Sequence, residues 1–183
     1  VIPSPDDSRG GILDSVKRTY NSDENRVVLS GVSDGGTAAY YFAMLDTSPF
    51  ASFLPLNGFV MVLGNPQAGA EGELFLNNLL NKPFFIVNGG ADPLYPTRVV
   101  ERYIRHLEEG GLTIDYHPQP GAGHNTAWWP QVKDTFDKFV REHARDPQPA
   151  RLTWTSAAKP STSRAHWLVI DRLAPTSAGK PLP

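Results

Sequence analysis

A glycine-serine-glycine pattern near the start of the chain has the spacing of a nucleophile turn. Gly31-x-Ser33-x-Gly35 lies directly between a β-branched stretch at residues 26–30 and an apolar stretch at residues 37–45. Glycine at both flanks would let neighbouring backbones pass closely while the Ser33 hydroxyl projects from the top of a sheet. The pattern therefore indicates a nucleophilic serine. The alternative is a tight turn in which Ser33 only caps the following helix.

A serine hydroxyl is a poor nucleophile at neutral pH, so it needs a base, and the base needs a group that orients it. Asp92 follows an apolar stretch at residues 83–87, and His124 follows an alternating stretch at residues 112–116. If these stretches are parallel strands, the loops that leave their carboxyl ends converge at one edge of the sheet. We therefore predict that Ser33 is the nucleophile, His124 its base and Asp92 the orienting acid.

Both partners of the serine have plainer alternatives. Asp92 precedes a proline and could be no more than a turn residue. Four other histidines compete with His124; two fall within helical stretches, one ends a strand and one lies near the carboxyl terminus. They are His106, His143, His117 and His166. None of them follows a core strand in a glycine-flanked loop, and this favours His124 as the base.

Three further residues are expected close to the reacting groups. The backbone N–H of Asp34 directly follows the nucleophile and is predicted to donate a hydrogen bond to an oxyanion. Trp128 and Trp129 follow the histidine loop. We expect one of these tryptophans in the core and the other in the substrate pocket.

Stretches with strand and helix patterns alternate along the chain, which predicts an α/β fold with a mostly parallel sheet and helices on both faces. The expected strands are at residues 26–30, 52–56, 83–87 and 112–116. The expected helices are at residues 8–20, 37–45, 73–80, 97–109 and from about 129 to 140. The first strand is apolar enough to be buried on both faces.

A second, smaller unit is expected at the carboxyl end, because composition changes at the Asp-Pro-Gln-Pro sequence that starts at Asp146. We assign residues 1–148 to the α/β domain. Residues 149–183 are assigned to a linker, a β appendage with strands at 152–155 and 166–170, and a mobile tail.

The overall composition excludes several classes of protein. The 183 residues are 40% apolar, carry a net charge of −2 and include no cysteine. Disulfide scaffolds, thiol nucleophiles and cysteine metal sites are therefore excluded, and nucleic-acid binding is disfavoured. No apolar run approaches the roughly 20 residues that span a bilayer. We expect no cofactor, no metal, no nucleic acid and no membrane span, and we place a secreted or periplasmic location ahead of a cytoplasmic one.

Three motifs in this order resemble the carboxyl-terminal half of a serine α/β-hydrolase. They are the segments Asn25–Gly36, Gly89–Pro96 and Gly121–His124. The chain is similar to the carboxylesterase, phospholipase and dienelactone hydrolase group, with polyhydroxybutyrate depolymerase-like esterases and prolyl oligopeptidase-like peptidases nearby. This resemblance covers about residues 6–145. It implies a triad of Ser33, Asp92 and His124 and a small ester substrate, cleaved through an acyl-serine intermediate.

The chain departs from this group at its start. Family members place several strands and an oxyanion-hole loop, often with a His-Gly-Gly motif, before the helix that here begins near Ser8. Nothing in residues 1–25 matches these elements, and the chain starts at Val1 without a signal-peptide pattern. We therefore expect a truncated or processed chain that lacks one oxyanion donor. The strand at residues 26–30 would then lie at an open apolar edge, covered by self-association or by upstream polypeptide.

Two other functions stay open at this point. A prolyl oligopeptidase-like serine peptidase would use the same triad. A non-catalytic hydrolase-like domain would contribute binding or structure, and the missing amino-terminal elements are the argument for it.

Overall fold

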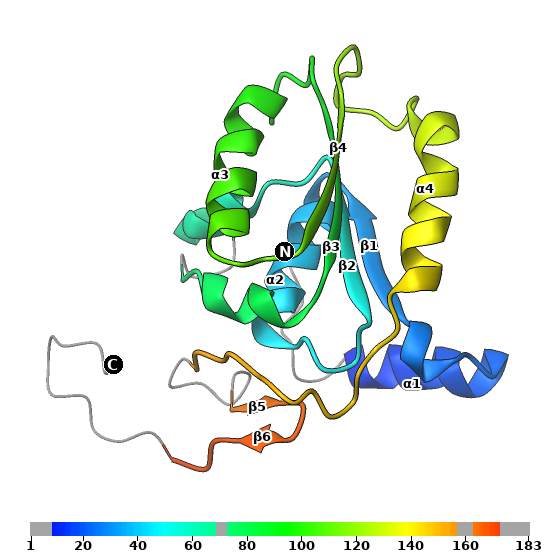
Figure 1. The fold of residues 1–183 in the computed structure, drawn as a ribbon, viewed down its shortest axis with the longest axis vertical. Helices are drawn as coiled ribbons and strands as arrows, with labels where there is room; N and C mark the ends of the chain where they lie inside the picture. Colours follow the sequence, from blue (N-terminus) through cyan, green and yellow to red (C-terminus); the bar gives the residue numbers. More distant parts are fainter. Residues whose placement is uncertain (1–8, 69–72, 157–162, 173–183) are drawn as a thin grey trace, which may run out of the picture.

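The computed structural model describes residues 9–68, 73–156 and 163–172 and contains a four-stranded parallel sheet between layers of helices (Figure 1). The strand order follows the sequence, from one edge of the sheet to the other. The strands are β1 (Val28–Val32), β2 (Ser52–Leu56), β3 (Phe84–Gly89) and β4 (Ile114–Gln119). Each agrees with a predicted strand within a few residues, and the predicted fold class is confirmed.

Helices cover both faces of the sheet. The α-helices are α1 (Arg9–Tyr20), α2 (Asp34–Leu45), α3 (Thr97–Glu109) and α4 (Trp129–Glu142). The 3₁₀-helices are η1 (Glu24–Arg26), η2 (Val60–Gly64), η3 (Pro66–Ala68) and η4 (Leu76–Asn81). Helices α2 and α3 pack on one face and α4 packs on the other (Figure 1). None of the helices in the described part of the chain is long and apolar enough to cross a membrane.

Strand β3 shows how the two layers share one sheet. Phe84 and Ile86 belong to the apolar cluster beneath α2 and α3, whereas Phe85 and Val87 belong to the cluster beneath α4. All four side chains are fully buried. Successive side chains of a strand point to opposite faces, so a central parallel strand needs this continuous apolar run.

Strand β2 is central although Pro55 removes one hydrogen-bond donor from it. The N–H groups of Phe53 and Asn57 both donate towards β3, to the carbonyls of Pro83 (3.2 Å) and Val87 (2.7 Å). The nitrogen of Pro55 lies midway between them, so it also faces β3. The ladder between β2 and β3 therefore has a gap at the proline, and the rest of the strand is unaffected.

Two amino-terminal elements are less buried than predicted. Strand β1 pairs only with β2 and its residues are half-buried or exposed, with Val32 at 42% exposure. The expectation that this strand lies at an open edge is therefore confirmed, and the expectation that it is buried on both faces is wrong. The apolar stripe of α1 is also open to solvent, because Ile12 is 66% and Tyr20 is 75% exposed. Apolar surface therefore accumulates along the β1 edge.

The carboxyl-terminal unit differs in detail from the prediction. The small β appendage is confirmed as an antiparallel pair, β5 (Arg164–Ala165) and β6 (Leu168–Val169). The strand predicted at residues 152–155 is wrong. The N–H groups of Thr153 and Thr155 instead donate to the side-chain oxygens of Asn81 (2.9 Å) and Asn78 (2.6 Å).

Other predictions for this unit remain open. The predicted tail from residue 174 lies outside the described residues. The division of the chain at residue 148 stays a prediction.

The two glycines around Ser33 have unequal roles. A Cβ built on Gly31 would lie 2.5 Å from the carbonyl carbon of Gly35, a distance that real side chains do not tolerate. A Cβ built on Gly35 would meet nothing within 4 Å. The expectation that both flanks need glycine for close passage is therefore correct for Gly31 and wrong for Gly35.

This asymmetry predicts opposite effects for two matched substitutions. Gly31→Ala should lower the free energy of unfolding by about 1 to 3 kcal/mol, because it overpacks the turn. Gly35→Ala should leave it unchanged or raise it by up to about 1 kcal/mol, because alanine favours the helix. Unfolding in urea, followed by tryptophan fluorescence, measures both. Equal stability of the two variants would contradict the packing argument.

Candidate active site

Ser33 occupies the sharp turn between β1 and α2. Its backbone angles are φ 58° and ψ −117°, a conformation that non-glycine residues rarely adopt and that costs on the order of 1–3 kcal/mol. Its N–H donates to the carbonyl of Leu56 (2.9 Å), and its carbonyl accepts from Thr37 N–H (2.9 Å). The side chain makes no capping hydrogen bond to α2, which argues against Ser33 as a plain helix cap.

The structure brings Ser33, His124 and Asp92 together at the carboxyl edge of the sheet. Ser33 Oγ lies 2.7 Å from His124 Nε2, and His124 Nδ1 lies 2.6 Å from Asp92 Oδ2. Both distances are within ordinary hydrogen-bond reach. The three residues come from the loops after β1, β3 and β4, which is the convergence predicted from the parallel sheet.

Asp92 serves the turn and the histidine with different oxygens. Oδ1 accepts the N–H groups of Leu94 (2.8 Å) and Tyr95 (3.1 Å), which leaves Oδ2 for His124. Burial alone would raise the pKa of this carboxyl group, but the hydrogen bonds from His124, Tyr95 and Leu94 together lower the pKa below its ordinary value. The carboxylate is therefore kept charged beside the imidazole.

The other histidines have other neighbours. His117 Nε2 lies 2.8 Å from Asp115 Oδ1 on β4, and His143 Nδ1 lies 2.8 Å from the Phe139 carbonyl. His106 is on α3 and His166 is in the turn between β5 and β6. Among the five histidines, it is His124 that faces Ser33.

The remaining predicted residues lie around this group. Asp34 is the first residue of α2, so its N–H has no carbonyl partner within the helix and lies next to Ser33. Trp128 is almost fully buried in the core beneath α4, and Trp129 is half-buried, with its ring 5.1 Å from that of Phe136. The oxyanion role of Asp34 and the pocket role of the tryptophans stay predictions.

One aromatic residue near the histidine was not identified from the sequence. The ring of Tyr95 meets that of His124 edge-on at 5.8 Å and lies 5.8 Å from the ring of Phe59. Burial raises the pKa of the Tyr95 hydroxyl, and the charges of Asp34 and Asp92 raise it further. In the sequence, the feature that could have identified Tyr95 is its position three residues after Asp92, in the same loop.

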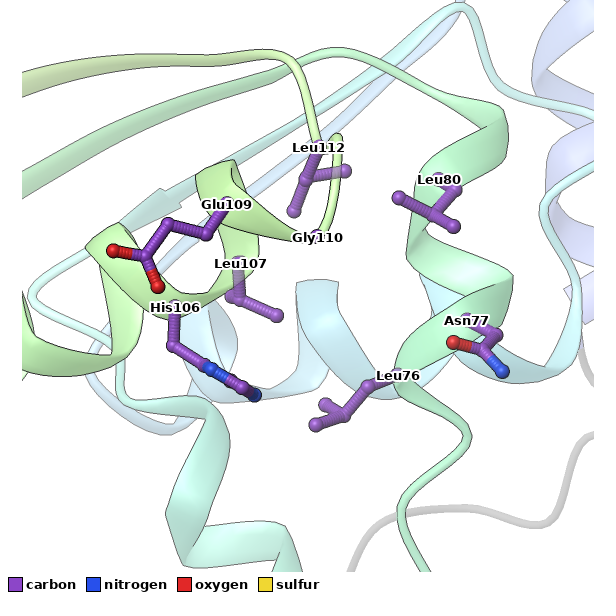
Figure 2. Close-up of a pocket in the computed structure, with 8 residues that line it drawn as sticks. All are labelled: Leu76, Asn77, Leu80, His106, Leu107, Glu109, Gly110 and Leu112. Atoms are coloured by element: carbon purple, nitrogen blue, oxygen red, sulfur yellow. The ribbon is translucent and has the colours of Figure 1, made fainter.

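A hollow at the other end of the sheet does not reach these residues. It has a volume of about 300 Å³ and lies between η4 and the end of α3 (Figure 2). Leucines line it together with His106, Glu109 and Asn77. Because η4 and the end of α3 precede β3 and β4, this hollow is at the amino edge of the sheet.

Comparison with known proteins gives a relative in sequence. The bifunctional acetylxylan esterase/xylanase of Neocallimastix patriciarum is 28% identical over an alignment of 148 residues, and the match covers 76% of this chain and 20% of that protein. The chain therefore spans about a fifth of the length of this relative. No protein-family model matches the chain.

Several solved structures share the fold. Acylaminoacyl peptidase from Pyrococcus horikoshii superposes with a TM-score of 0.60 at 14% identity, over 76% of this chain and 28% of that one. S-formylglutathione hydrolase from Staphylococcus aureus gives 0.56 at 21% identity, over 70% and 57%. The carboxylesterase from Bacillus cereus gives 0.53 at 22% identity, also over 70% and 57%. The chain spans less than two thirds of each of these structures.

The lowered pKa of Asp92 predicts a pH-dependent contribution to stability. A carboxyl group whose pKa is lowered by folding stabilises the folded state at pH values above its ordinary pKa of 3.8. This stabilisation is lost as the pH falls through the pKa of the group in the folded protein. Asp92→Asn should therefore lower the free energy of unfolding by about 1 to 2 kcal/mol at pH 6 and by less at pH 3. Urea unfolding at both pH values measures the difference.

The matched control is Asp137→Asn, on the exposed face of α4, where the carboxylate pairs with Lys133. A surface pair of this kind is worth at most about 1 kcal/mol. If the two variants lost stability equally, and with the same pH dependence, the Asp92 argument would be wrong.

Proposed function

We propose that this chain, which has the α/β-hydrolase fold, is the carboxyl-terminal portion of a serine hydrolase that cleaves carboxylic esters. The main support for this proposal is the pair of hydrogen bonds that connects Ser33 Oγ to His124 and His124 to Asp92. A serine that only shaped a turn would need neither these hydrogen bonds nor a strained backbone.

The proposed reaction follows from the positions of these groups. Ser33 Oγ attacks the ester carbonyl while His124 Nε2 takes the hydroxyl proton, and Asp92 holds the imidazole and stabilises its charge. The N–H of Asp34 donates to the oxyanion that forms. His124 then gives its proton to the leaving alcohol, which leaves an acyl-Ser33. Water activated by His124 attacks this acyl group and releases the acid.

The triad does not decide between ester and amide substrates, because esterases and serine peptidases can use the same three residues. Two of the structures that share the fold are named a carboxylesterase and an S-formylglutathione hydrolase, and a third is named an acylaminoacyl peptidase. We favour esters, because a relative in sequence is named a bifunctional acetylxylan esterase/xylanase. An acetyl ester is accordingly the first substrate to assay, with a peptide amide beside it.

Labelling with a fluorophosphonate tests the activated serine directly. In the longest available form of the protein, the probe should attach to Ser33, as located by mass spectrometry of the peptides. Ser33→Ala should remove the label. His124→Ala keeps the hydroxyl but removes its base, and should lower the labelling rate by several orders of magnitude. Labelling that survives His124→Ala, or that falls on other serines, would favour the non-catalytic alternative.

The β1 edge supports the proposal that further polypeptide completes this domain. An apolar groove of about 380 Å³ opens between α1 and the edge of the sheet. Its apolar lining is Ile12, Leu13, Val16, Leu29, Phe42, Pro49 and Phe50, and Asp14, Lys17 and Asp46 also line it. An edge strand beside exposed apolar surface invites association. We propose that upstream sequence in a longer parent protein covers this edge and supplies the second oxyanion donor.

This proposal predicts how residues 1–183 behave when expressed alone. They should self-associate, and any folded fraction should be a poor esterase, because loss of one oxyanion donor costs about 10²- to 10³-fold in rate. Ile12→Lys, on the exposed stripe of α1, should reduce the association without restoring the rate. Light scattering and hydrolysis of a short-chain activated ester measure the two effects. A monomer with full activity would contradict the proposal.

A further inference from the structure

Asn57 is a buried polar residue that lies at the end of β2, beyond the residues assigned to the triad. It has no exposed surface, and its backbone φ of 48° is in the left-handed region. We infer that Asn57 is a positioning residue that ties the loop of the acid to the loop of the base. This inference rests on the proposed function, because it concerns how the same triad is held in place.

The side-chain amide of Asn57 bridges two loops that are far apart in sequence. Its Nδ2 donates to the carbonyl of Asn125 (2.8 Å), the residue directly after His124. Its Oδ1 accepts the N–H of Gly89 (3.1 Å), the last residue of β3 and three residues before Asp92. A single side chain therefore contacts the backbone on both sides of the histidine–aspartate hydrogen bond.

The end of β2 also holds the nucleophile. The carbonyl of Leu56 accepts the N–H of Ser33 (2.9 Å), and the N–H of Asn57 donates to the carbonyl of Val87 (2.7 Å). Two consecutive residues therefore connect to all three loops that carry the triad. Asn57 therefore lies between the Asp92 loop and the His124 loop. The distance between these two loops decides whether Asp92 can orient the imidazole while the imidazole also faces Ser33.

The chemistry of the position calls for an amide of this size. The two partners are an N–H donor and a carbonyl acceptor, so the side chain must accept at one atom and donate at the other. The partners also fix which atom of the amide is oxygen. An aspartate would place a charged acceptor against the Asn125 carbonyl, and an apolar residue would leave two backbone groups without these partners. Asparagine also tolerates the left-handed backbone better than most residues.

Another buried amide offers a matched control. Asn78, on η4, is also fully buried; its Nδ2 donates to the carbonyls of Met44 (2.8 Å) and Thr155 (2.9 Å), and its Oδ1 accepts Thr155 N–H. It ties the carboxyl-terminal segment to the domain and touches none of the three loops. If Asn57 and Asn78 both had a purely structural role, substitution of either residue would have the same effect on kcat.

The test compares Asn57→Gly, Asn57→Asp and Asn78→Ala in the longest available form of the protein. Asn57→Gly removes the bridge while permitting the same backbone angles, and it should lower kcat for an activated ester by about 10²-fold with little change in KM. Asn57→Asp keeps the size and the bond to Gly89, so it decides the question if the glycine variant does not fold. It should lower kcat by at least tenfold. Asn78→Ala should lower the melting temperature and leave kcat unchanged.

A second readout does not depend on turnover. The proton shared by His124 Nδ1 and Asp92 should give a low-field signal in the proton NMR spectrum, and this signal should weaken or move in both Asn57 variants and persist in Asn78→Ala. If the unsubstituted protein hydrolyses no ester, the proposed function fails, while the NMR comparison still tests Asn57. Unchanged kcat and an unchanged signal in the Asn57 variants would overturn the inference.

Discussion

The close approach of the start of α2 to the end of β2 is the constraint on which the rest of the structure depends. A Cβ on Gly36 would lie 2.7 Å from the Leu56 carbonyl oxygen, and one on Gly58 would lie 2.5 Å from the carbonyl carbon of Gly36. Backbone therefore packs directly on backbone at this point. The contact holds Ser33 in a conformation that it would not adopt by itself, because the energy of that conformation must be offset by its surroundings.

The same contact sets the position of the other two loops. Strand β2 lies between β1 and β3, so residues at its carboxyl end lie beside the loops that leave both neighbours. The loop after β4 reaches back over β3, where Ala91 N–H donates to the Ala122 carbonyl at 2.9 Å. Asp92 and His124 are thus brought together by backbone packing, and their short hydrogen bond is a consequence of this packing.

The β1 side and the β4 side of the sheet differ in how well helices cover the strands. At the β3 and β4 side, the fully buried β3 and the half-buried β4 support the loops that carry Asp92 and His124. At the β1 side, Ser33 follows an edge strand beside an exposed apolar stripe. His124 and Asp92 therefore follow strands that α3 and α4 cover. Ser33 and the N–H of Asp34, the predicted oxyanion donor, follow the strand at the open edge.

The features that depend on local spacing can be predicted from the sequence. The strand-turn-helix around Ser33, the order of Ser33, Asp92 and His124, and the helix at Thr97–Glu109 follow from short-range patterns of apolar residues, glycine and turn residues. The parallel sheet then required the three loops to leave it at one edge.

Tertiary structure alone decided the features that depend on contacts between distant residues. Asn57 gives no motif, because its partners lie about 30 and about 70 residues away. The strand expected at residues 152–155 failed for a similar reason: its backbone bonds to asparagine side chains of η4 rather than to another strand. The exposure of the apolar stripe of α1 also gave no signal in the sequence, since an apolar pattern shows which face can be buried and not whether anything is present to bury it.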